Sequence, residues 1–228
     1  MVKRFLIIAT PHCRNDNTEF RLREKFPDFN ILRFKSPEEL VPEILEKISP
    51  EWIFFPHWSW IIPKSVHEKY PCVIFHMTDV PYGRGGSPLQ NLIVRGHKST
   101  VISALKCQEE LDGGPVYLKK PLSLEGTAEE ILQRASNIIT EMIKEIVLNP
   151  KPPSPQIGPI TKFIRRKPSD GNFAALNTPE GVFDYIRMLD GDGYPPAFLE
   201  SGNMFVEFKK ALRVGDTVEA IAVIKVKK

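Results

Sequence analysis

The sequence predicts an α/β fold with a mostly parallel sheet, followed by a small C-terminal α+β subdomain. Short apolar segments alternate with helical segments over the first two thirds of the chain. This alternation is typical of a parallel sheet with helical crossovers. A proline-rich segment then precedes a hairpin pattern and a final alternating strand, which indicate a second, smaller unit.

Each predicted element follows from its local pattern. Apolar runs and period-two alternation predict strands over 4–10, 29–34, 52–55, 72–76, 100–106, 115–122, 197–200, 204–208 and 217–226. Helical periodicity and cap residues predict helices over 18–25, 36–48, 63–68, 89–95, 127–148 and 179–189. The helix at 36–48 begins with a serine cap, a proline and two acidic residues, which is a typical helix start.

The prolines set the predicted boundaries. No regular structure is expected in the run Asn149-Pro150-Lys151-Pro152-Pro153-Ser154-Pro155. Its prolines have no backbone N–H to donate, and each proline restricts the conformation of the residue before it. We therefore predict a first domain over 1–149, an extended linker over 150–160 and a small subdomain over 161–228.

Composition excludes several classes of protein. The chain has 31 basic and 28 acidic residues, a net charge of +3, whereas dedicated nucleic-acid binders usually carry a stronger basic excess. No apolar run approaches the roughly 18 residues of a membrane span, and the run at 5–9 is too short for a signal peptide. The three cysteines are scattered without a CxxC pair, so neither zinc nor disulfides are indicated. We expect a cytoplasmic protein with no metal and no membrane partner.

Three segments follow predicted strands and carry polar or glycine-rich chemistry: 56–60, 76–88 and 109–114. Ligands of open parallel sheets bind at the carboxyl ends of the strands, so we expect the site there. The middle segment is the most informative. His76 ends an apolar strand and is followed by Thr78, Asp79 and a glycine-rich turn.

The stretch from His76 to Gln90 resembles the signature of the folate-dependent formyltransferases, whose best-known members act on methionyl-tRNA. The family pattern is N-x-H-x-S-L-L-P-x-x-R-G-x-x-P-x-Q, and Thr78 takes its serine position. The residues that match it without a gap are His76, Pro81, Arg84, Gly85, Pro88 and Gln90. The segment 111–114, Leu-Asp-Gly-Gly, resembles the family's L-D-T-G at the family spacing.

The resemblance implies a Rossmann-like formyltransferase fold and an N-formyltransferase that uses 10-formyltetrahydrofolate as co-substrate, without a metal. Asp112 would take the proton of the attacking amine, and His76 would stabilise the oxyanion or relay the proton, with Thr78 as a further catalytic candidate. The residues implied in folate binding are Trp58, Trp60, Ile62, Arg84, Glu110 and Leu111. Those implied in acceptor binding are Gly85, Gly86, Ser87, Gln90, Arg165 and Arg166. A core role for the tryptophans, a turn role for the glycines and a solvated surface for the arginines stay open.

One position departs from the family pattern. The family's catalytic asparagine falls on Ile74, which cannot donate a hydrogen bond. Loss of one oxyanion donor typically costs about 10²–10³ in rate. Thr78 and Asn91 are candidates for a replacement donor. A non-catalytic folate- or nucleotide-binding module is therefore an alternative.

The acceptor is predicted from size and motif detail. Only a short segment follows the linker and the net charge is small, which favours a small acceptor over tRNA. The runs His-Met-Thr-Asp at 76–79 and Gly-Arg-Gly-Gly-Ser-Pro-Leu-Gln-Asn-Leu at 83–92 resemble formyltransferases of nucleotide-linked 4-amino-4,6-dideoxy sugars of the pseudaminic-acid type. We therefore expect a nucleotide sugar, UDP-linked in preference to dTDP- or GDP-linked, with methionyl-tRNA as the alternative. A homodimer through the C-terminal strands is open.

Overall fold

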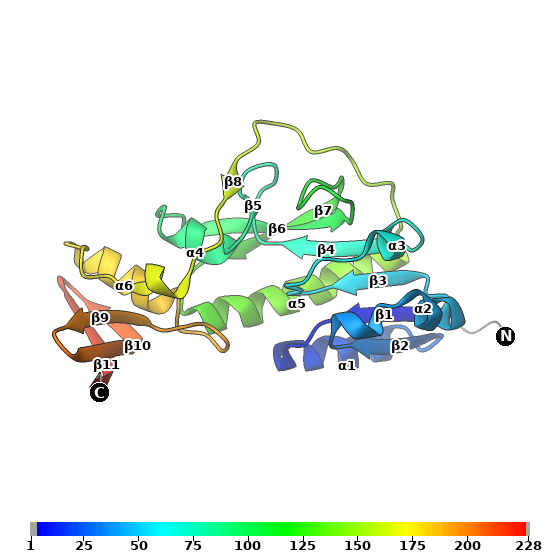
Figure 1. Cartoon of the computed structure of the whole chain (residues 1–228). Helices are drawn as coiled ribbons and strands as arrows, with labels where there is room; N and C mark the ends of the chain where they lie inside the picture. Colours follow the sequence, from blue (N-terminus) through cyan, green and yellow to red (C-terminus); the bar gives the residue numbers. More distant parts are fainter. Residues whose placement is uncertain (1–3, 227–228) are drawn as a thin grey trace. The chain divides into compact units, whose positions relative to one another are not determined.

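The computed structural model describes residues 4–226, which form two compact units (Figure 1). The first unit comprises 4–84, 101–122 and 133–162, and the second comprises 85–100, 123–132 and 163–226. The predicted domains are continuous stretches of sequence divided near 149 and 160, and this division remains a prediction. No helix within the described residues is both long and apolar enough to cross a membrane.

A six-stranded sheet with the order β2-β1-β3-β4-β6-β7 is the frame of the first unit. Its strands are β1 (Arg4–Ala9), β2 (Phe29–Phe34), β3 (Trp52–Phe55), β4 (Cys72–His76), β6 (Ser99–Lys106) and β7 (Val116–Ser123). β1 pairs in parallel with β2 and β3, and β3 pairs in parallel with β4. The predicted α/β fold is thus confirmed, and the six predicted strands agree to within one residue at either end. β6 is the exception in direction, because it runs antiparallel to β4.

Short helices cover the apolar faces of this sheet. They are η1 (Cys13–Asn15), α1 (Asp16–Lys25), η2 (Pro37–Glu39), α2 (Pro42–Ile48) and α3 (Lys64–His67). Leu45 of α2 and Val66 of α3 are fully buried in one cluster with Ile53 and Phe55 of β3. The side chains of a strand alternate between its two faces, so alternate β3 residues reach this cluster.

The single helix predicted over 36–48 was wrong, because the chain forms η2 and α2 instead. The predicted start is present: Ser36 N donates to Glu39 Oε2 at 3.0 Å, which is half of a capping box. Pro42 then interrupts the helix. It has no N–H to continue the hydrogen-bond series, and it holds Val41 in an extended conformation with φ −97° and ψ 144°.

Helix α5 (Ala128–Leu148) confirms the helix that the apolar periodicity predicts over 127–148. Its buried apolar side chains are Ala128, Ile131, Leu132, Ala135, Ile139, Met142, Ile143 and Ile146. In the first unit it also carries the buried hydroxyl of Thr140, which lies 2.8 Å from the hydroxyl of Thr18 in α1. A buried pair of hydroxyls satisfies both groups and fixes the register of α1 against α5.

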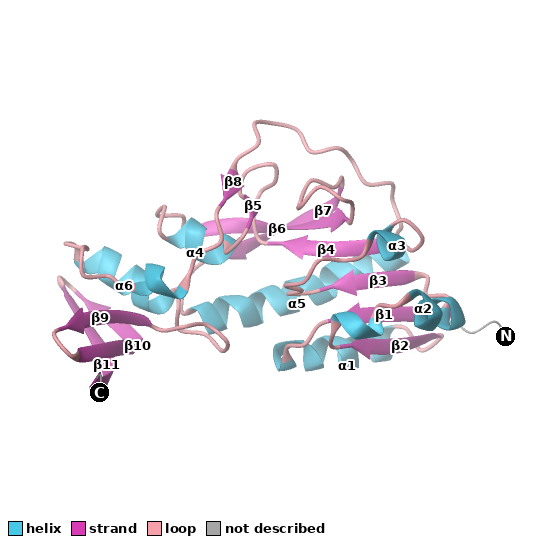
Figure 2. Ribbon diagram, viewed as in Figure 1, coloured by secondary structure: helices cyan, strands magenta, loops and turns pink. Residues whose placement is uncertain are grey.

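The second unit contains helices α4 (Pro88–Ile93) and α6 (Pro179–Arg187), the short η3 (Pro168–Gly171), and an antiparallel sheet. The sheet has the order β11-β10-β9, with strands β9 (Ala197–Ser201), β10 (Met204–Val214) and β11 (Thr217–Val226). α6 packs against β10 (Figure 2). The hairpin and the final strand are confirmed. The two-residue strands β5 (Arg84–Gly85) and β8 (Lys162–Phe163) escaped prediction, because two residues carry no periodicity.

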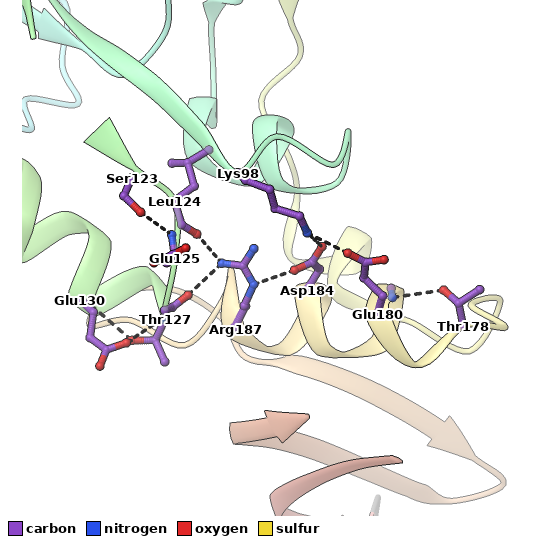
Figure 3. A network of polar contacts seen from close by, with 12 residues as sticks. Lys98, Ser123, Leu124, Glu125, Thr127, Glu130, Thr178, Glu180, Asp184 and Arg187 are labelled. Carbon is purple, nitrogen blue, oxygen red and sulfur yellow. Dashed lines mark hydrogen bonds and ion pairs between the residues drawn. The ribbon is translucent and has the colours of Figure 1, made fainter. Parts of the chain in front are cut away.

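A buried arginine holds α6 to the segment before α5 (Figure 3). Arg187 is 4% exposed; its Nε donates to Asp184 Oδ1 at 2.6 Å. Its Nη1 donates to the carbonyl groups of Leu124 at 2.7 Å and Gly126 at 2.9 Å. The arginine therefore satisfies one buried carboxylate and two backbone acceptors at once.

Replacement of this arginine is expected to weaken the second unit strongly. Arg187→Met removes the donor from two carbonyl groups and leaves the Asp184 carboxylate with the more distant Lys98 ammonium, 4.0 Å away. Breaking a buried pair typically costs about 3–5 kcal/mol. Urea unfolding followed by circular dichroism measures the loss. Lys225→Met is the control, because its partnership with Glu207 lies on the surface and is expected to contribute under about 1 kcal/mol. Equal losses in the two variants would contradict the assignment.

Candidate active site

His76 and Asp112 form an enclosed pair in the first unit. His76 ends β4 and is 7% exposed, and Asp112 is 8% exposed. His76 Nδ1 lies 3.5 Å from Asp112 Oδ2, while His76 Nε2 lies 2.7 Å from the carbonyl oxygen of Gly83. A carbonyl oxygen can only accept, so Nε2 carries a hydrogen and donates it. Nδ1 is therefore the nitrogen at which the ring gains or loses a proton, and it faces the carboxylate.

Asp112 reaches His76 by a route that differs from the predicted one. The segment 109–114 was expected to follow a parallel strand at the same edge of the sheet as His76. That expectation was wrong, because β6 is antiparallel: Ser103 pairs with His76, and Lys106, where β6 ends, pairs with Val73. Three residues of strand span about 10 Å, so the loop after β6 must turn back to bring Asp112 to His76.

Two backbone features allow this return. Asp112 has φ 51°, the left-handed conformation, which aspartate tolerates better than most side chains. Gly114 passes so close to β6 that a Cβ atom there would lie 1.8 Å from the carbonyl oxygen of Lys106. Gly113 N also donates to the carbonyl of Glu110 at 3.0 Å. The Gly-Gly pair of the motif thus serves the path of the loop.

The thiol of Cys107 lies beneath this loop. Burial raises its pKa to about 11, and the negative charge of Asp112 contributes to the increase. Cys107 is thus an unreactive neighbour of the carboxylate. Among the described residues, no cluster of His, Cys, Asp and Glu has the composition to hold a metal ion.

Thr78 supports the histidine through a shared acceptor. It is fully buried, and its hydroxyl donates to the Gly83 carbonyl at 3.2 Å, the same oxygen that accepts from His76. The carbonyl of Thr78 in turn accepts from the Ser103 hydroxyl at 2.7 Å. Thr78 thereby fixes the turn that orients the imidazole, and a direct catalytic role for it remains a prediction.

The predicted folate wall lies against the core on the same side as Ile74. Trp58, Ile62 and Ile74 all pack on the cluster that contains Phe55. The Trp58 ring centroid lies 4.8 Å from that of Trp60, and Trp60 is 45% exposed. Trp58 Nε1 is buried and has no hydrogen-bond partner among the described residues. A buried donor without an acceptor costs about 1–3 kcal/mol, so this atom fits a heteroatom of a bound ligand.

Arg84 and Glu110, also predicted to bind folate, contact each other. Arg84 is 6% exposed; its Nη1 donates to Glu110 Oε1 at 2.7 Å, and its Nε donates to Gln156 Oε1 at 3.0 Å. Leu111, between Glu110 and Asp112, is 62% exposed and presents an apolar surface. Arg84 thus holds the loop, and contact of these three residues with folate remains a prediction.

Part of the predicted acceptor-binding set comes together in the second unit. A Cβ atom on Gly86 would lie 2.5 Å from Arg165 Cβ, so these residues are in close contact. The backbone N–H of Arg166 donates to the Ser87 hydroxyl at 3.1 Å. The Arg166 guanidinium lies over the Tyr185 ring, 5.2 Å from its centroid. Acceptor binding by these residues remains a prediction.

Gln90 and Gly85 have structural tasks within the second unit. Gln90 is 5% exposed, and its Nε2 donates to the carbonyl of Met188 at 3.4 Å. Gly85 has φ 107°, and a Cβ atom there would lie 2.5 Å from the carbonyl oxygen of Phe163. Any side chain at this position would push the two backbones apart.

Both candidate replacements for the missing asparagine already have hydrogen-bond partners within the protein. Ile74 lies two residues before His76 and therefore on the same face of β4, where the family's amide would stand beside the imidazole. The Thr78 hydroxyl is used by Gly83, and the Asn91 amide donates to three backbone carbonyl groups. The hydrogen bonds of both side chains are thus made within the protein.

His57 is a second histidine at a strand end, directly after β3. Its Nε2 lies 3.2 Å from the Ser136 hydroxyl, and its ring meets that of His12 edge-on, with centroids 6.4 Å apart. Burial, and to a lesser degree the charges of Arg14 and His12, lowers the pKa of His57 to about 3. The ring is therefore neutral at physiological pH.

A family model and a similar solved structure point to the same family. A family model described as the C-terminal domain of methionyl-tRNA formyltransferase matches residues 168–225. A solved structure, a methionyl-tRNA formyltransferase from Clostridium thermocellum, is 44% identical, with a TM-score of 0.94 over 98% of this chain and 99% of that chain. The chain belongs to the methionyl-tRNA formyltransferase-like family. The resemblance read from 76–90 and 111–114 is thereby confirmed.

Two further similarities extend the comparison, one in sequence and one in fold. A methionyl-tRNA formyltransferase from Thermodesulfovibrio yellowstonii is 30% identical over 63% of this chain, which spans about half (49%) of that relative's length. The fold also resembles HypX from Aquifex aeolicus, solved in complex with tetrahydrofolic acid, with 18% identity and a TM-score of 0.74 over 91% of this chain and 37% of that chain. The second similarity concerns the fold alone.

The predicted acceptor was wrong. The family model and the 44% identical structure carry the methionyl-tRNA formyltransferase name, which contradicts a nucleotide sugar as partner and the exclusion of nucleic acid. The argument from size failed because the short C-terminal segment is itself the part that the family model matches. The argument from net charge failed because a sum over the chain does not describe any one surface.

A matched pair of glycine variants tests the path of the Asp112 loop. Gly114→Ala places a methyl group against the Lys106 backbone, so the loop must move, and faster amide hydrogen exchange over 107–116 is expected. Gly113→Ala is the comparison, because the nearest atoms that a Cβ there would meet belong to the Glu110 side chain and not to backbone. Equal exchange in the two variants would show that the close backbone approach is not what fixes the loop.

His57 is expected to reduce stability in mild acid. Its pKa is about 3 in the folded protein and about 6.5 when unfolded, so between these values the unfolded chain binds more protons. The free energy of unfolding therefore falls as pH drops from about 6.5 toward 3. His57→Asn, which tolerates the left-handed backbone (φ 54°), should lose this contribution. Urea unfolding at pH 7 and pH 5 measures the slope, and an identical slope in both proteins would refute the assignment.

Proposed function

We propose that this protein transfers the formyl group of 10-formyltetrahydrofolate to the amino group of methionyl-tRNA. The observation that carries the proposal is the enclosed His76–Asp112 pair, in which Nδ1 lies 3.5 Å from Oδ2. Its support from outside the site is the family match over 168–225 and the 44% identity to a methionyl-tRNA formyltransferase. The site supports the chemistry of this proposal, and the family supports its acceptor class.

Asp112 prepares the amine. An amine attacks a formyl carbon only when its nitrogen lone pair is free, and an α-amino group is largely protonated near neutral pH. The Asp112 carboxylate attracts the ammonium group and accepts its proton, so one carboxylate serves both steps. Asp112 releases this first proton to solvent before the attack. The new bond joins the neutral amine nitrogen to the formyl carbon, and the bond from that carbon to N10 of folate breaks. The second proton that the amine nitrogen loses passes through Asp112 to the leaving N10 nitrogen.

His76 stabilises the charge that moves during this exchange. Its Nδ1 faces the carboxylate and can share the proton, while Nε2 stays oriented by the Gly83 carbonyl. A protonated ring beside the reacting carbon stabilises the negative charge on the formyl oxygen. Thr78 contributes by holding the Gly83 carbonyl. With Ile74 at the family's asparagine position, this charge stabilisation falls more heavily on His76.

The folate would lie on the aromatic wall. Trp58, Trp60, Ile62 and the exposed Leu111 offer apolar surface for a flat pterin ring, and the buried Trp58 Nε1 offers one unused donor. The similar fold of HypX, solved with tetrahydrofolic acid, supports a folate ligand. 10-Formyltetrahydrofolate supplies the carbon at the oxidation level of formate, so the transfer needs no metal and no redox partner.

The acceptor would be held by groups of the second unit. Arg165 and Arg166 lie shortly before the segment that the family model matches, which begins at residue 168. Guanidinium groups suit the phosphates of a tRNA acceptor stem. Ser87 and Gly86 lie against them. We place this activity in the cytoplasm, where aminoacylated tRNA is made.

Mass spectrometry of the acceptor tests the activity. The protein is incubated with 10-formyltetrahydrofolate and methionyl-tRNA, the ester is hydrolysed, and formylmethionine is expected. Asp112→Asn is expected to lower the rate by about 10³-fold or more, because the amine loses its base. Folate binding, followed by tryptophan fluorescence, should persist in the variant. Methionyl-tRNA that stays unmodified would refute the acceptor, and folate binding without any transfer would favour a binding module.

A further inference from the structure

The segment 154–161, which we call the strap, is attached to the rest of the first unit by several hydrogen bonds. Figure 1 shows the chain between α5 and β8 as a long irregular segment. Ser154 exchanges two backbone hydrogen bonds with Val116 of β7, at 2.7 and 2.9 Å. At the other end, Thr161 N donates to the Pro81 carbonyl at 3.1 Å. Between these anchors Ile157 is 91% exposed, so apolar burial does not hold the strap in place.

Gln156 is the side chain by which the strap reaches the catalytic loop. Its Nε2 donates to the carbonyl oxygens of Asp112 and Gly114, both at 2.8 Å, and its Oε1 accepts from Arg84 Nε at 3.0 Å. Carbonyl groups only accept and a guanidinium only donates, so the orientation of the amide is fixed. Both amide hydrogens are used on the loop that carries the catalytic carboxylate.

These bonds act on the conformation of Asp112 itself. Asp112 has φ 51°, in a region that side chains rarely adopt, and the two carbonyl groups held by Gln156 flank Gly113. Arg84, the third partner of Gln156, also pairs with Glu110 on the other side of Asp112. The loop is therefore held at both ends by one connected set of contacts.

We propose that Gln156 is a positioning residue for the formyl transfer: it holds Asp112 in the left-handed conformation that directs the carboxylate to His76. The proposal rests on the proposed function of the His76–Asp112 pair. Gln156 lies outside both sequence motifs, and its side chain bonds to the backbone carbonyls of Asp112 and Gly114 and to Arg84. Its effect on the reaction must therefore pass through the backbone of the loop.

Gln156→Glu is the sharpest test, because it keeps the length of the side chain and the acceptor for Arg84. It removes both donors and places a carboxylate against two carbonyl oxygens. We expect kcat to fall by about 10²-fold, the usual cost of a misplaced catalytic group, with KM for 10-formyltetrahydrofolate within about threefold of wild type. Gln156→Met, of similar length without polar hydrogens, should give the same split. Wild-type kcat in both variants would overturn the proposal.

Two controls separate positioning from a general loss of structure. Ser154→Ala changes the strap but keeps its backbone bridge to β7, so it should keep wild-type kcat. In an Asp112→Asn background, Gln156→Glu should lower the residual rate by less than about threefold, because the residue acts through Asp112. Independent, multiplying effects in the double variant would contradict the proposal.

A measurement without substrate distinguishes this proposal from the proposed function. The ring ¹⁵N signals of His76, assigned with His76→Asn, report the approach of the Asp112 carboxylate, the Gly83 carbonyl being the other group on the ring. In Gln156→Glu they should shift toward their positions in Asp112→Asn. If the wild type fails to formylate methionyl-tRNA, the function is refuted while this shift still decides the positioning role. Signals that stay at their wild-type positions in Gln156→Glu would overturn it.

Discussion

The hydrogen bond from His76 Nε2 to the Gly83 carbonyl decides how the rest of the site must be built. Once Nε2 is used as a donor, only Nδ1 can exchange a proton, so a catalytic carboxylate has to arrive on the Nδ1 side. Thr78 donates to the same carbonyl and keeps the turn in place. The position of Asp112 is thus dictated by the tautomer that the Gly83 turn selects.

The antiparallel course of β6 makes that arrival difficult. The chain leaves the sheet near Val73 and must return to the level of His76 within a short loop. Three local features allow the loop to return: the left-handed conformation of Asp112, the close approach of Gly114 to the Lys106 backbone, and the Arg84–Glu110 ion pair. Polar contacts do most of this holding, because Glu109, Glu110 and Leu111 are exposed and contribute no core.

Features carried by local pattern were predictable from the sequence, and features that depend on distant partners were not. Apolar runs predict buried strands, and the strands of the sheet could therefore be predicted. An apolar run does not indicate the direction of its strand, so the antiparallel orientation of β6 could not be predicted. Pro42 should have divided the helix at 36–48. The motifs singled out His76 and Asp112, which the structure brings within 3.5 Å of each other, whereas Gln156 is one glutamine in a proline-rich stretch and carries no signal. The unused Trp58 donor is visible only when its surroundings are known.

Because of the strap, the part of the chain that builds the site extends beyond α5 to Gln156. A protein cut at residue 149, where composition alone ends the first domain, would retain His76, Asp112 and all of α5. It would lack the glutamine that is bonded to the Asp112 loop from 44 residues further along the sequence. During synthesis, too, His76, Asp112 and the strands of the sheet would emerge before the side chain of Gln156. On this view the site matures only after the proline-rich segment has left the ribosome.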